Sequence, residues 1–237
     1  MKFENTRVYN MYNAIRGARN PLNSWNKMDS KEVLDESNQI SCVIGPNDMK
    51  LLKMLIGADN VKNAVGAPNA KFRRQILVSV DITGPLCFWK EFDTYKTGTV
   101  ANSTSTMHKL TSTPITKECF EKNPFGEEYD LPTELIDYLE KLRLQYLEAS
   151  NSDNNSTVEK RKALWYKLIY SLPDSWLQTR TITMNYEVLA NIAFWRRNHK
   201  QNCWSGKDNP SMKNMMSWIS SLPYASDLIF TNQYQGE

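Results

Sequence analysis

The feature that most constrains this chain is an alternating run over residues 75–83 that stops at a Gly-Pro pair. Every second residue of the run is a branched apolar one, namely Ile76, Val78, Val80 and Ile82. Strand side chains alternate between two faces, so the run predicts a central β-strand with one buried face. Pro85 suits a first helical turn, and the aromatic-rich segment after it predicts a helix that ends near Tyr95.

The rest of the chain reads mainly as helix. Gly45 and Pro46 open a helix that Gly57 ends, residues 58–70 read as a mobile loop, and the hydroxyl-rich residues 97–116 read as a polar loop. Further helices are expected over residues 132–149, 157–172 and 185–200, with Asn185 as a cap and a short strand over 180–184 before it. The remainder is expected to be helical, with Pro210 near the start of one helix and Pro223 at a break. We therefore expect one α+β domain over residues 1–237, rich in helix, with a small central antiparallel or mixed sheet.

Composition excludes several functional classes. Lysine and arginine number 29 against 26 acidic residues, a net charge of +3 without a basic cluster, so nothing points to nucleic acid. No apolar run approaches the ~18 residues of a membrane helix, and the four cysteines show no paired spacing, so we expect a cytoplasmic protein with reduced thiols and no membrane partner. Phosphate-loop, dinucleotide-loop and zinc-ligand spacings are absent, and no metal site is expected.

Two stretches carry a resemblance to a known family. The first contains Pro85, then Lys90-Glu91-Phe92, Thr94-Tyr95-Lys96 and a Ser/Thr/Asn segment from Asn102 to Ser105. The second contains Leu172-Pro173, Thr179-Arg180, Asn185, Leu189, Arg196 and Trp204. A weaker match near the start of the chain is Ala14-Ile15-Arg16. In order and spacing these stretches resemble the flavin-dependent thymidylate synthases (ThyX), and the chain looks like a divergent, phage-type member because it is short and rich in Asn and Lys.

The chain departs from this family at positions where the family has positively charged arginines. The family's Arg-His-Arg triplet is matched here by Thr94-Tyr95-Lys96, and a later signature arginine falls on Met107. Glu187 stands where the family has an arginine two residues after the Asn. An arginine offers a planar two-pronged donor to phosphate, whereas a lysine offers a point charge. The resemblance thus leaves the enzyme assignment open: an active chain would be a C5 methyltransferase of dUMP type.

The resemblance implies two groups of binding residues and no assigned catalytic residue. Those expected to bind a nucleotide or its phosphate are Lys90, Tyr95, Lys96, Asn102, Ser105 and Lys109. Those expected to bind a flavin or a nucleotide are Arg180, Asn185 and Arg196. FAD is the implied cofactor, folate and NADPH are implied only if the chain is active, and a homo-oligomer, a tetramer in the family, is the implied assembly.

Three hypotheses follow from these residues. The first is a ThyX-like protein that binds a nucleotide and FAD, with reduced methylation. The second is a non-catalytic protein of phage origin that sequesters or senses a nucleotide. The third is a structural or interaction protein. Bound flavin would favour the first, a bound nucleotide alone would favour the second, and neither would favour the third.

Overall fold

The computed structural model describes residues 1–34, 39–57, 68–150 and 155–230 of the chain. It divides into two compact units. The hairpin unit consists of Met1, Thr83–Asp93 and Asn102–Arg180, and the sheet unit consists of Lys2–Ile82, Thr94–Ala101 and Thr181–Glu237. Strands continue from one unit into the other, and the single domain stays a prediction. Among the described residues, no helix combines the length and hydropathy needed to cross a bilayer.

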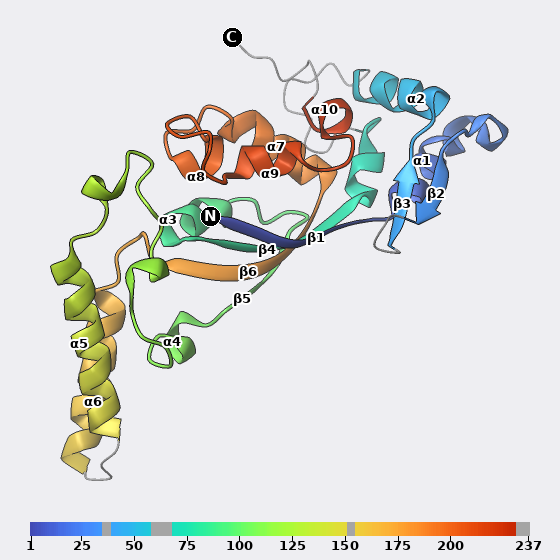
Figure 1. The fold of residues 1–237 in the computed structure, drawn as a ribbon. Helices are drawn as coiled ribbons and strands as arrows, with labels where there is room; N and C mark the ends of the chain where they lie inside the picture. Colours follow the sequence, from blue (N-terminus) through green and yellow to red (C-terminus); the bar gives the residue numbers. More distant parts are fainter. Residues whose placement is uncertain (35–38, 58–67, 151–154, 231–237) are drawn as a thin grey trace. The chain divides into compact units, whose positions relative to one another are not determined.

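A four-stranded sheet is the main β element, with the strand order β1-β4-β6-β5 drawn in Figure 1. Its strands are β1 Lys2–Tyr9, β4 Leu77–Pro85, β6 Leu177–Asn185 and β5 Val100–Ser103. Asp81 contacts Thr181, whereas Thr83, farther along β4, contacts Thr179, which is earlier in β6. Strands β4 and β6 are therefore antiparallel. Strand β4 occupies an inner position with Val78, Val80 and Ile82 buried, which confirms the predicted central strand.

The aromatic helix follows this strand as expected but is shorter. Helix α3 Leu86–Phe92 begins directly after Pro85 and ends at Phe92 rather than near Tyr95. The Trp89 indole N–H donates to the carbonyls of Gly84 and Gln178, each at 3.0 Å. These bonds fix the start of α3 against β6 within the hairpin unit, because a buried indole N–H needs an acceptor.

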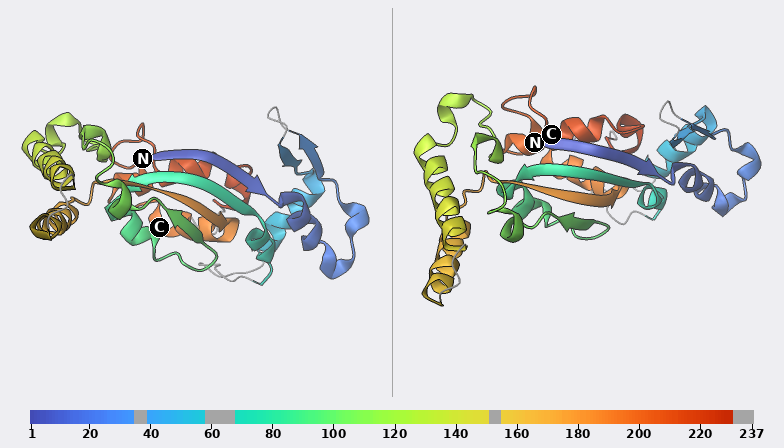
Figure 2. Two further views of the ribbon diagram at one scale, coloured as in Figure 1. Left: turned by 90° about the horizontal axis from the view of Figure 1, so that it is seen from below. Right: turned by 60° about the horizontal axis from the view of Figure 1, so that its bottom comes forward.

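The hairpin unit owes its name to two long helices. They are α5 Thr133–Ser150 and α6 Asn155–Tyr170, which lie side by side in both views of Figure 2. Both match the helices predicted for this region. Their shared core is built from Leu110, Ile115, Phe120, Leu139, Leu142 and Leu168. The short elements of this unit are α4 Thr106–Lys109, η4 Lys117–Cys119 and η5 Glu127–Tyr129.

The sheet unit carries the remaining elements. They are α1 Met11–Ala18, η1 Asn20–Leu22, η2 Trp25–Lys27, the antiparallel pair β2 Lys31–Leu34 and β3 Ile40–Val43, α2 Pro46–Gly57, η3 Lys71–Gln75, α7 Tyr186–Arg196, α8 Asn202–Ser205, α9 Met215–Ser220 and α10 Ala225–Leu228. Helix α9 lies over strand β1 in Figure 1. Trp218 of this helix stacks on Phe3 with 5.2 Å between the ring centres, and its indole N–H donates to the Thr6 hydroxyl at 3.0 Å. Helix α2 confirms the predicted bounds.

Several expectations need correction. The hydroxyl-rich segment predicted as a loop contains strand β5 and helix α4, and all four β5 residues are exposed, so a strand formed without any apolar alternation. The expected strand over residues 180–184 is longer, and α7 ends at Arg196 instead of near Lys200. Strands β1, β2 and β3 were not predicted. Within the segment expected to be a mobile loop, residues 58–67 lie outside the described residues.

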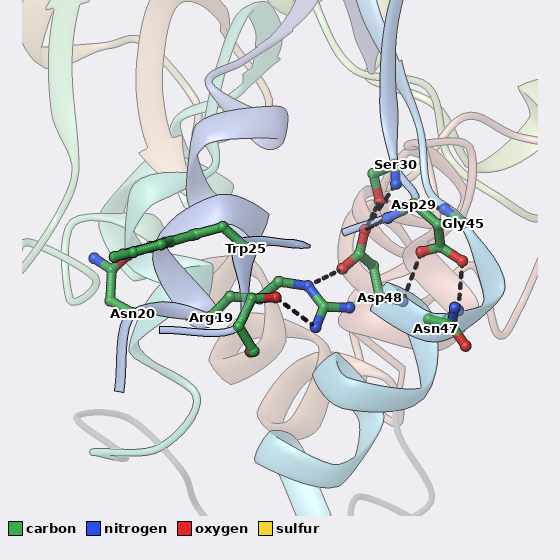
Figure 3. A network of polar contacts seen from close by, with 9 residues as sticks. Arg19, Asn20, Trp25, Asp29, Ser30, Gly45, Asn47 and Asp48 are labelled. Atoms are coloured by element: carbon green, nitrogen blue, oxygen red, sulfur yellow. Dashed lines mark hydrogen bonds and ion pairs between the residues drawn. The ribbon is translucent and has the colours of Figure 1, made fainter. Parts of the chain in front are cut away.

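A buried ion pair joins Arg19, which directly follows α1, to Asp48 of α2 within the sheet unit (Figure 3). The Arg19 guanidinium Nε donates to Asp48 Oδ1 at 2.5 Å, and the two side chains are 5% and 0% exposed. Asp48 Oδ2 also accepts from the backbone N–H groups of Asp29 and Ser30 and from the Ser30 hydroxyl. Because both oxygens of this carboxylate accept hydrogen bonds and one of them faces a guanidinium, the buried charge is compensated.

Candidate functional site

The nine predicted site residues fall into both units. Tyr95, Lys96, Asn185 and Arg196 belong to the sheet unit, whereas Lys90, Asn102, Ser105, Lys109 and Arg180 belong to the hairpin unit.

Arg196 forms the centre of an aromatic cluster in the sheet unit. Its guanidinium carbon lies 5.7 Å from the centre of the Tyr95 ring and 5.2 Å from the centre of the Trp204 ring. Its Nε also donates to the Tyr95 hydroxyl at 3.0 Å. His199 meets the same indole edge to face at 6.1 Å. The structure thus brings together two predicted residues, Tyr95 and Arg196, whose cation–π contacts hold the guanidinium in place.

Lys96 follows this cluster in a tight turn. The Thr99 N–H donates to the Lys96 carbonyl at 3.3 Å, and Gly98 adopts φ +76°, a left-handed conformation that favours glycine. A Cβ at Gly98 would lie only 2.9 Å from Asn185 Nδ2, so the turn and Asn185 are in close contact. The Lys96 side chain is exposed and makes no ion pair with the described residues. It is therefore available to a ligand.

Asn185 caps helix α7 as the sequence predicts. Its Oδ1 accepts from the Val188 backbone N–H at 3.0 Å, and the residue is 8% exposed. The side chain thus supplies one of the acceptors that the first turn of a helix lacks. This bond uses the oxygen of the amide, so Asn185 holds the turn and the helix together within the sheet unit.

Glu187 shows how the reversed charge at the family position is balanced. The carboxylate is buried in α7 and lies 3.6 Å from Arg74 Nε, which comes from η3. Arg74 precedes the central strand, and the sequence reasoning assigned it no role. A buried carboxylate needs a counter-charge, and Arg74 supplies it for Glu187. The family's arginine at position 187 is thus replaced by a glutamate whose charge a different arginine balances.

In the hairpin unit, Arg180 is held by several partners. Its guanidinium lies 4.4 Å from the centre of the Trp89 ring, Nη1 donates to Asp93 at 2.7 Å, and Nε donates to the Gln178 amide oxygen at 3.0 Å. Lys90 pairs with Asp174 at 2.5 Å, and both side chains are well exposed. Exposed ion pairs are weak, so Lys90 can exchange its partner for a ligand, whereas Arg180 is fixed in place.

The segment around β5 places its three predicted residues at the surface. Asn102 and Lys109 are exposed, and Ser105 caps α4 by accepting from the His108 backbone N–H at 3.2 Å. Ser105 thus has a local structural role, as Ser does at many helix starts. Asn102 and Lys109 stay open to solvent.

Trp204 and Arg74 are among the cluster residues that the sequence did not reveal. Trp204 was noted as a family landmark but not as a stacking partner, and Arg74 was not noted at all. A tryptophan eight residues after an arginine gives no local signal, because the turn between α7 and α8 brings the two together. Chemically, the clusters offer cations and aromatic faces for an anionic or planar ligand.

Comparisons with known proteins gave matches among solved structures alone. No family model matches the chain, and no curated protein matches it. A crystal structure of thymidylate synthase X (ThyX) from Helicobacter pylori, solved with FAD and dUMP, is 14% identical with a TM-score of 0.63, and each chain is covered completely. A second structure of that enzyme, also with FAD and dUMP, is 14% identical with a TM-score of 0.57 over 96% of this chain and 98% of that one. The chain therefore has the α+β fold of the flavin-dependent thymidylate synthases, as its sequence predicts.

Proposed function

We propose that this chain is a nucleotide-binding protein of ThyX type that holds FAD weakly or not at all and performs little or no C5 methylation of dUMP. The fold supports the binding part of the proposal, because the similar structures were solved with FAD and dUMP and are matched along almost their whole length. The contacts of the candidate side chains support the loss of activity.

The observation that carries the proposal is the commitment of both candidate arginines to partners in this chain. Arg196 is held by Tyr95 and Trp204, and Arg180 is held by Asp93, Gln178 and the Trp89 ring. Of the triplet, Lys96 keeps one exposed charge but not the fork of an arginine. A point charge can attract a phosphate, yet it orients a reacting pyrimidine poorly, and orientation contributes much of catalysis.

Arg180, Asn185 and Arg196 do not fit FAD as they stand. A flavin pyrophosphate needs several donors that converge on its oxygens. Arg180 and Arg196 instead donate to neighbours within their own units, and Asn185 accepts from the Val188 backbone N–H. We therefore derive no reaction step through FAD, folate or NADPH. Lys96 in the sheet unit and Asn102 and Lys109 in the hairpin unit favour the phosphate and sugar groups of a nucleotide.

A homo-oligomer is part of the proposal, with the tetramer of the resemblance as its expected size. Five large apolar or aromatic side chains of the α5 and α6 helices are more than a third exposed: Tyr138, Leu144, Leu147, Tyr166 and Tyr170. Such exposure on a helix pair is typical of a surface that a partner covers. Sedimentation equilibrium of the purified protein tests this, and a monomer at all concentrations contradicts it. A phage origin and a cytoplasmic location stay predictions.

The binding proposal is tested by identifying what the protein carries and what it binds. Mass spectrometry of the supernatant after denaturation should find a nucleotide, and calorimetry should detect binding of dUMP and little or no binding of FAD. We expect Lys96→Ala to weaken nucleotide binding by about 1 to 3 kcal/mol, the scale of a lost charge-assisted contact. Lys53→Ala is the matched control, because Lys53 is an exposed lysine of the same unit that pairs with Asp227.

Activity is tested separately by growth. We expect no rescue of a thymidine-requiring strain, because each lost charge-assisted contact costs on the order of 1.5 to 3 kcal/mol. Growth without thymidine that depends on this chain would contradict the proposed loss of activity. Absence of binding by both ligands, together with no co-purified molecule, would instead favour the structural or interaction role.

A further inference from the structure

Arg73 is a completely buried arginine whose charge lacks a counter-ion in the described part of the chain. Its side chain is 0% exposed, and neither Nε nor Nη2 has a hydrogen-bond partner there. Nη1 donates to the Leu228 carbonyl at 3.4 Å, a long hydrogen bond. An unpaired buried charge is costly in free energy, so its persistence needs an explanation.

The two nitrogens without partners belong to one edge of the guanidinium. The N–H bonds of Nε and Nη2 point in parallel, and this edge binds both oxygens of a carboxylate or phosphate in the side-on bidentate arrangement. The third nitrogen, on the other side of the group, is the one that holds Leu228. The unpaired atoms therefore form a complete two-pronged donor rather than two scattered defects.

The surrounding structure fixes this donor edge in position. Arg73 lies in η3. The backbone N–H of Arg73 donates to the Ala70 carbonyl at 3.0 Å and closes the first turn of this segment. This segment packs against α1 and α7 and leads directly into the central strand β4. A guanidinium that is already held in one conformation loses little entropy when it binds a ligand.

The electrostatic surroundings favour an anion. Lys71 and Arg74 flank Arg73 in the same short segment, and Glu187 faces Arg74 at 3.6 Å. Glu187 thus balances one of three neighbouring cations. Within a buried setting the attraction between the guanidinium and an anion is screened less than in water, and it opposes the cost of removing the anion from water.

We propose that Arg73 anchors an oxyanion-binding site in the sheet unit, which takes a phosphate or a carboxylate group through Nε and Nη2. Both ligands present two oxygens at the spacing of the guanidinium edge. The site is independent of Lys96 and of the binding role proposed above. It uses a side chain that no sequence motif singled out.

The first test is thermal unfolding of the full chain with inorganic phosphate, with acetate, and with sodium chloride at equal ionic strength. We expect phosphate or acetate, whichever matches the site, to raise the unfolding midpoint saturably by about 5 °C or more, and chloride to leave it unchanged. Arg73→Met should abolish the rise, and Arg73→Lys should lose most of it because the fork is gone. Lys71→Met, an exposed cation of the same segment, should keep it.

A second measurement needs only the wild-type protein. In ¹⁵N spectra of the arginine side chains, one Nε–H signal should move downfield as the anion is added and be missing from Arg73→Met. If neither anion moves an Nε–H signal and neither raises the midpoint, the proposal is wrong. It is also wrong if Arg73→Met responds to the anion as the wild type does. A response to phosphate alone identifies a phosphate site, and one to acetate alone identifies a carboxylate site.

Discussion

Arg19 and Arg73 are both almost completely buried in the sheet unit, yet among the residues that the structure describes only Arg19 faces a carboxylate. Arg19 pairs with Asp48, whose oxygens accept three further hydrogen bonds from Asp29 and Ser30. Arg73 has one long bond to a carbonyl. The difference teaches that burial alone does not tell what a charged residue does. A buried charge that is paired with an opposite charge and hydrogen-bonded stabilises the fold, whereas a buried charge that lacks these contacts suggests a site for a ligand.

The largest expected effect comes from breaking the complete pair. Asp48→Asn leaves the buried Arg19 charge without compensation, so we expect the free energy of unfolding to fall by about 3 to 5 kcal/mol. Urea denaturation measures it. Asp93→Asn is the control, because Asp93 pairs with Arg180 but its own side chain is 51% exposed, and its loss should stay below about 1 kcal/mol. Equal losses would remove the distinction between the two kinds of pair.

Acid should remove part of the same stabilisation. Burial alone would raise the pKa of Asp48, but hydrogen bonds from Ser30, Arg19 and backbone N–H groups outweigh burial and lower that pKa. A carboxyl with a lowered folded-state pKa stabilises the fold fully above its unfolded pKa, and this contribution is lost as pH falls through the folded pKa.

We therefore expect the wild type to lose stability below about pH 4 and Asp48→Asn to lose less over that range. Other carboxyls with lowered pKa, such as Glu140, titrate in both proteins, so the difference between the two curves isolates Asp48. Parallel curves down to the acid limit would show that Asp48 is not the group responsible.

Removing the charge of Arg73 should change the free energy of unfolding in the opposite direction to the loss of the Arg19–Asp48 pair. Without added anion, Arg73→Met removes an unpaired buried charge and keeps an unbranched stem of similar length, so we expect stability to rise by about 1 to 2 kcal/mol. Arg19→Met should lower stability, because it leaves the Asp48 charge buried without its cation. Urea denaturation in phosphate-free buffer compares them. A loss in both variants would mean that Arg73 also serves the architecture.

The smallest expected effect lies on the polar face of the sheet. Asp81 accepts from the Thr181 hydroxyl at 2.6 Å and from the Asn5 amide at 2.7 Å, and these bonds lower the pKa of Asp81. Because solvent screens the group, we expect Asp81→Asn to cost well under 1 kcal/mol. A loss comparable with that of Asp48→Asn would mean that exposure is a poor guide to the importance of a carboxylate in this chain.

The sequence predicted the elements that carry local signals. The central strand has its alternation, and Asn185 has its position before a helix, so both were found. Strand β1 buries little on either face and thus shows no alternation. The pairing of Arg19 with Asp48 joins positions 29 residues apart, and that of Arg196 with Tyr95 joins positions 101 apart. Such pairs depend on how the elements pack, which a single sequence does not specify.

The helical hairpin has a consequence for how this chain can evolve. It is inserted between β5 and β6, which are neighbours in the sheet, and its core is made of its own residues and the segment before it. A segment inserted between two strands that are neighbours in the sheet can change in length without altering the strand order. We therefore expect the hairpin to tolerate insertions, deletions or a fused domain better than the strands of the sheet do.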